Sequence, residues 1–79
     1  MKKANVRTWV YEDGAWIITI YCYREETFEA WLMHENYGTQ MLIFGASATG
    51  TCCTLAGFKH LVEHQLADSK EIYQSRFLS

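Results

Sequence analysis

The sequence predicts a single α+β domain, residues 1–79, in which a four-stranded antiparallel sheet is followed by a C-terminal helix. Three observations lead to this prediction. The first half of the chain contains four short segments rich in β-branched and aromatic residues. Short polar turns join these segments, which favours an antiparallel meander. From Thr51 onward, apolar residues recur with a helical period instead.

The first two predicted strands form a hairpin. Residues 6–11 are rich in strand formers, and Asp13 and Gly14 make a dipeptide that is typical of tight hairpin turns. We expect this turn to place Tyr11 opposite Trp16. The remaining strands are predicted at residues 16–23, 27–34 and 39–44.

The C-terminal part of the chain carries an amphipathic helical pattern. The segment that begins at Asp68 resembles a helix cap followed by an acid three positions later. We therefore expect a break or kink near Asp68 and a second short helix after it. One continuous helix is the alternative, because the later apolar residues keep roughly the same phase. The apolar side of the first part is formed by Leu55, Phe58, Leu61, Val62 and Leu66.

Composition and charge exclude several classes of function. The net charge is −2 and the few cations are scattered, which argues against the basic footprint of a nucleic-acid-binding protein. No apolar run is long enough to span a membrane, and the N-terminal residues lack a signal-peptide pattern. The three cysteines are an odd number and do not form a disulfide framework. We therefore expect a cytoplasmic protein without a cofactor.

Both faces of the predicted sheet are apolar, whereas a sheet solvated on one face should alternate apolar with polar residues. Two-residue connections are assumed in assigning the faces of the later strands. The face expected beneath the helix carries Trp9, Tyr11, Trp16, Ile18, Ile20, Trp31, Met33, Leu42 and Phe44. The other face carries Val6, Val10, Ile17, Tyr21, Tyr23, Phe28, Leu32, Met41 and Ile43.

This second face is the candidate contact surface, because large apolar patches usually mark binding sites and tyrosines suit interfaces. Three alternatives stay open. Curling of the sheet would bury the face within the monomer, a second copy would cover it in a homodimer, or a different protein would bind there. The candidate interface residues are Val10, Ile17, Tyr21, Tyr23, Phe28 and Leu32, rimmed by Glu25, Glu26 and Glu29.

Gly45 and Gly50 have the spacing of a phosphate-binding loop. However, Thr51 replaces the lysine of that motif and Cys52 replaces its hydroxyl residue. No later strand is predicted that could complete the parallel fold in which such loops occur. We interpret the stretch as the corner before the helix, capped by Ser47, Thr49 or Thr51, with a weaker anion niche at Gly50, Thr51 and Cys52.

Two adjacent cysteines open the predicted helix. A thiolate of Cys52 or Cys53 in a first helical turn would be stabilised by the helix dipole. A cysteine nucleophile also needs a base, and His34, His60 and His64 are the candidates. His60 lies about two turns from Cys53, at 5.4 Å per turn, which is too far for a hydrogen bond. Packing is therefore the favoured role of these cysteines.

Residues 60–64 fit the pattern H-x-x-E-H and resemble the signature of inverted zinc metalloproteases. The resemblance implies that His60 and His64 are metal ligands and that Glu63 is the general base. Catalytic zinc normally has three protein ligands. Asp68 and Glu71 are the only carboxylates that follow, so a solvated helix face is the simpler interpretation.

These observations together favour a non-catalytic protein–protein interaction module that binds another protein or a second copy. In size, charge and architecture the chain is similar to small inhibitors encoded by phages and mobile elements, anti-CRISPR proteins among them. That resemblance implies steric occlusion of a host complex. One alternative is a small thiol or metal site using Cys52, Cys53, His60, Glu63 and His64. Another is a binder of single-stranded nucleic acid through sheet aromatics, which lacks the usual basic groove.

Overall fold

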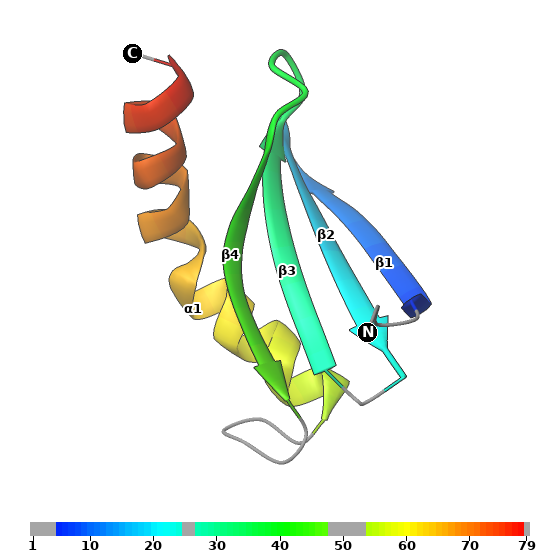
Figure 1. Cartoon of the computed structure of the whole chain (residues 1–79). Helices are drawn as coiled ribbons and strands as arrows, with labels where there is room; N and C mark the ends of the chain where they lie inside the picture. Colours follow the sequence, from blue (N-terminus) through cyan, green and yellow to red (C-terminus); the bar gives the residue numbers. More distant parts are fainter. Residues whose placement is uncertain (1–4, 25–26, 48–53, 79) are drawn as a thin grey trace.

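The computed structural model describes residues 5–24, 27–47 and 54–78, and it confirms the predicted α+β architecture (Figure 1). Four antiparallel strands form one sheet in the order β1-β2-β3-β4. A helix follows and packs on one side of the sheet. The elements are β1 (Asn5–Asp13), β2 (Trp16–Tyr23), β3 (Thr27–His34), β4 (Gln40–Ser47), α1 (Leu55–Tyr73) and a π-helical end (Gln74–Leu78).

The hairpin between β1 and β2 has a connection two residues shorter than the expected pairing implied. Asp13 pairs with Trp16, so the two connecting residues are Gly14 and Ala15. Gly14 has a φ of 61°, a conformation that glycine adopts without the steric cost of a Cβ atom. The expected pairing of Tyr11 with Trp16 is therefore wrong by two residues. A shift of two residues leaves every side chain on the same face, so the faces assigned to β2 and to β1 from Trp9 onward are correct. Val6 lies at a register shift between Asn5 and Arg7, and the pairing does not assign it to a face.

The core lies between α1 and the face of the sheet that the helix covers. The Phe58 ring stacks on Phe28 at a centroid distance of 5.2 Å and meets Phe44 at 4.9 Å. These contacts join the first turns of α1 to β3 and β4. The buried apolar residues are Ile18, Ile20, Phe28, Ala30, Leu32 and Met41 from the sheet, and Phe58, Val62 and Tyr73 from the helix.

The faces predicted for β3 are inverted. Phe28 and Leu32 were expected on the uncovered face, but both are buried beneath α1. Trp31 and Met33, which were expected beneath the helix, alternate with them and lie on the opposite face. Cys22 pairs with Phe28, so three residues connect β2 to β3 instead of the assumed two. The pairing of β3 with β2 is therefore shifted by one residue from the expected register, which moves every side chain of the strand to the other face.

A β-bulge changes the faces again within β4. Trp31 pairs with Leu42, whereas the preceding residue of β3 pairs with Phe44, which leaves Ile43 as the extra residue. Phe44 consequently lies beneath the helix, as predicted. Met41 is buried there too, against expectation, and Ile43 packs partly against the core. Leu42 lies on the uncovered face, where the sequence analysis did not place it.

The helix begins later than predicted and continues further. Thr54 is the N-cap residue, and its side-chain oxygen accepts a hydrogen bond of 3.0 Å from the Gly57 amide. α1 then runs through Asp68 without a break, so the continuous alternative is the one observed. Figure 1 shows that α1 bends along its length, from beneath the sheet to the side of β4. Within the described residues, no helix combines the length and apolar character that a membrane crossing requires.

Two lysines attach α1 to the first hairpin. The Lys70 ammonium forms an ion pair of 2.6 Å with Asp13 and lies 5.9 Å from the centre of the Trp16 ring. The Lys59 ammonium lies 5.6 Å from the centre of the Trp9 ring. Both cations are thereby held on the helix side of the sheet.

Candidate functional site: the open face of the sheet

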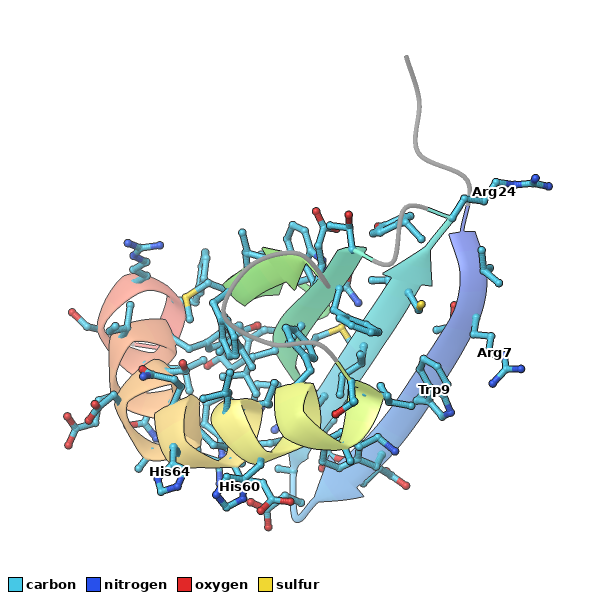
Figure 2. All side chains as sticks on the ribbon, turned by 90° about the horizontal axis from the view of Figure 1, so that it is seen from below. Arg7, Trp9, Arg24, His60 and His64 are labelled. Atoms are coloured by element: carbon cyan, nitrogen blue, oxygen red, sulfur yellow. The ribbon has the colours of Figure 1, made fainter. Side chains whose placement is uncertain are left out.

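The face of the sheet turned away from α1 is the candidate site, and we call it the open face. Figure 2 shows α1 lying along one side of the sheet only. The strand register groups the open-face positions into three rows that cross all four strands. The middle row is Val10, Thr19, Trp31 and Leu42, and the flanking rows are Glu12, Ile17, Met33 and Gln40, and Thr8, Tyr21, Glu29 and Gly45.

The middle row makes an apolar band across the sheet. At its ends, Val10 is 61% exposed and Leu42 is 46% exposed, so nothing in the described chain covers them. Trp31 is half-buried in the centre of the band. Thr19 is buried between these large neighbours although it lies on the uncovered side. The side chains of the band therefore pack on one another and expose their outer surfaces.

Carboxylates flank the apolar band on both sides. Glu12 belongs to the row that also holds Ile17 and Met33, and Glu29 belongs to the row that holds Tyr21. Among the described positions of the open face there is no lysine or arginine. The open face therefore has an apolar centre and a negatively charged rim.

Tyr23 extends the open face toward the end of β2. Its ring stacks with Tyr21 at a centroid distance of 6.3 Å, and its hydroxyl donates a hydrogen bond of 2.8 Å to Glu29. Desolvation, followed by this hydrogen bond and the negative charge of Glu29, raises the pKa of Tyr23 to about 12. The interaction orients both side chains at the rim.

The structure brings together most of the predicted interface. Val10, Ile17, Tyr21, Tyr23 and Glu29 all lie on or beside the open face, as predicted. Phe28 and Leu32 belong to the core, as described above, and Glu25 and Glu26 lie outside the described residues.

Trp31, Met33 and Leu42 are the site residues that sequence reasoning missed. One available signal would have placed the first two correctly. Glu29 alternates in phase with Trp31 and Met33, and a carboxylate in mid-strand indicates the solvated face. The alternate positions Phe28, Ala30 and Leu32 are apolar, which fits the core side. For Leu42 there was no such signal, because its placement depends on the bulge in β4.

The predicted phosphate-loop stretch does not form a corner at its first glycine. Gly45 lies within β4 and pairs with Glu29, and β4 continues to Ser47. A carboxylate beside that glycine is unfavourable for phosphate binding. The whole predicted anion niche, Gly50, Thr51 and Cys52, lies outside the described residues, and so do Thr49 and Thr51, two of the three predicted caps.

The thiol and histidine motifs are only partly assembled. α1 begins at Leu55, so the described helix does not include Cys52 or Cys53, which lie outside the described residues. His60 and His64 are exposed on α1, with their Nε2 atoms 3.2 Å apart. The described residues contain no group of three or more histidine, cysteine or acidic side chains that could hold a metal. The third ligand of a metalloprotease site is therefore not found among them.

Comparisons with known proteins add no family to this description. No family model, curated protein or solved structure matches the chain. The residues of the open face, their exposure and their charge are therefore the features that indicate a function.

Proposed function

We propose that this protein is a non-catalytic binding module that docks the open face of its sheet onto another protein. The supporting observation is the uncovered apolar band that crosses all four strands, with Val10 and Leu42 exposed at its ends. Monomeric proteins rarely leave a large contiguous apolar patch without a partner. Trp31, Tyr21 and Met33 are also of the residue types that are enriched in protein interfaces.

The charge of the open face indicates the chemistry of the partner. Glu12 and Glu29 flank the band, so the complementary surface is an apolar patch bordered by lysine or arginine. The same charge disfavours nucleic acid, because phosphate contacts require cations. Lys59 and Lys70 are held on the helix side instead. A binder of single-stranded nucleic acid is therefore the weaker candidate, despite the aromatic side chains.

We further propose that binding acts by steric occlusion in the cytoplasm. The small size, mild acidity and lack of a disulfide framework support this form of action. They are the features that the chain shares with small inhibitors from phages and mobile elements. The likeness is one of size, charge and architecture, so the host complex is to be identified by experiment.

The decisive experiment compares two leucine-sized side chains with equal exposure. Leu42 on the open face and Ile72 on α1 are each 46% exposed. A photo-crosslinking residue at position 42 would capture the partner in the source cells, and the purified partner would then be titrated with Leu42→Glu and Ile72→Glu. We expect Leu42→Glu to weaken binding by about 30-fold or more, the effect of losing a hot-spot contact. Ile72→Glu should leave the affinity unchanged.

Two results would overturn this proposal. Loss of binding in Ile72→Glu but not in Leu42→Glu, with both variants folded, would move the interface to the helix. A purified protein that sediments as a dimer, and becomes a monomer in Leu42→Glu, would identify a second copy as the occupant of the open face. Val10→Glu provides an independent check, because Val10 lies at the other end of the band and is more exposed.

A further inference from the structure

His60 and His64 form a pair on the side of α1 that faces away from the sheet (Figure 2). Their Nε2 atoms are 3.2 Å apart, their ring centroids are 4.7 Å apart, and the rings are nearly perpendicular. Both residues lie well inside α1, so the helical backbone fixes their spacing. Positions four apart on a helix are neighbours on its surface. The two nitrogens therefore converge in solvent, where an ion can reach them.

The separation of these nitrogens matches that of two imidazole ligands on one metal ion. Zinc binds histidine nitrogen at about 2.0–2.1 Å, and two such ligands at a tetrahedral angle are about 3.3–3.4 Å apart. A hydrogen bond between the two rings would also account for the observed 3.2 Å, with the donor decided by the tautomers. The two explanations predict different results when zinc is added to the protein.

We propose that His60 and His64 chelate a divalent late-transition-metal ion through their two Nε2 atoms, with water in the remaining positions. Imidazole is a favoured ligand for zinc, copper and nickel. The site needs no third protein ligand and implies no catalysis. It lies on the helix, away from the open face, so it is independent of the proposed docking function.

Zinc titration followed by nitrogen NMR tests this proposal on the intact chain. We expect zinc to shift the Nε2 resonances of both His60 and His64 in parallel. His34 is an internal control, because it lies on β3 and not on α1. Its ring packs against Trp16 at a centroid distance of 5.0 Å. Its resonances should not follow the same titration curve. The histidine readout also separates this site from zinc binding at the cysteines.

The affinities of three variants distinguish a chelate from two separate histidines. In a chelate, the second histidine binds the same ion intramolecularly, which raises the affinity above that of one histidine. Removing either histidine therefore removes this increase in affinity. We expect His60→Gln and His64→Gln each to weaken zinc binding at this site by about tenfold or more. The double variant should be little weaker than either single variant. All three should remain folded, because both side chains are exposed.

Two outcomes would overturn the proposal. The first is that the Nε2 resonances stay at the positions of a ring-to-ring hydrogen bond throughout the titration. The second is that each single variant binds zinc as tightly as the parent chain, which would indicate two adventitious monodentate contacts. Either result would leave the docking function untouched, since Leu42→Glu tests a different surface.

Discussion

The Tyr23 hydroxyl and the Glu29 carboxylate are coupled at the rim of the open face. Desolvation and then Glu29 raise the pKa of Tyr23 from 10.0 to about 12. We predict that Glu29→Gln lowers the pKa of Tyr23 toward its usual value, because the glutamine keeps an acceptor oxygen but removes the charge. Tyrosine-labelled NMR between pH 9 and 13 would measure this shift. An unchanged pKa in the folded variant would contradict the role of Glu29.

The same coupling predicts how stability depends on alkaline pH. A raised pKa in the folded protein means that the neutral phenol of Tyr23 stabilises the fold. That contribution is fully present below about pH 10 and is lost as the pH rises through about 12. Burial, followed by the charges of Glu63 and Asp13, also raises the pKa of Tyr11. Ionisation of Tyr11 therefore also lowers the stability of the fold at alkaline pH. Urea unfolding should show a smaller alkaline loss in Tyr23→Phe than in the parent chain.

Phe58 is one of the three helix residues that are fully buried against the sheet. It is fully buried and packs against Phe28 and Phe44. We predict that Phe58→Ala lowers the free energy of unfolding by about 3–5 kcal/mol, because the substitution leaves a cavity in the core. Ile72→Ala is the control on the same helix, with an expected change within about 0.5 kcal/mol. Equal losses in both variants, measured by urea titration, would argue against the core assigned here.

At the scale of elements, α1 depends on its N-cap. The Thr54 side chain accepts a hydrogen bond from the Gly57 amide, which would otherwise lack a partner within the helix. We predict that Thr54→Ala lowers the free energy of unfolding by about 1 kcal/mol, whereas Thr54→Ser, which keeps the hydroxyl, is nearly neutral. Chemical denaturation of the two variants would measure the difference. A serine variant as unstable as the alanine variant would indicate that the cap is not the cause.

The strands and the helix show which parts of the fold can be predicted from the sequence. Strand number, order and helix position follow from hydrophobic period and turn residues, because these signals are local. The faces of β3 and β4 could not be read in this way. They depend on the register in which β3 pairs with β2, and on the extra residue Ile43 in the bulge of β4. The open face was therefore predicted on the correct side of β1 and β2, but Trp31 and Leu42 were placed in the core.

For the whole molecule, the core predicts a single unfolding transition. The sheet supplies one wall of the core, and Phe58, Val62 and Tyr73 of the helix supply the other. Neither wall buries its apolar side chains alone, and small domains usually unfold in one step. Helical circular dichroism and tryptophan fluorescence should therefore give coincident urea transitions, in the parent chain and in Phe58→Ala. Loss of helix before the fluorescence change would mean that the sheet is stable by itself.

The pairing of β3 with β2 limits where this chain can change in length, because it decides which side chains of β3 reach the core. Deletions in surface loops are usually tolerated, because the cost of loop closure varies slowly with length. The connection between β2 and β3 can therefore gain or lose a residue while Cys22 stays opposite Phe28, because hairpin loops of two to five residues are all common. One residue inserted inside β3 would instead exchange the sides of every position beyond it, unless a bulge absorbed the extra residue. The strand, and not the loop, is the part of this hairpin whose length the core fixes.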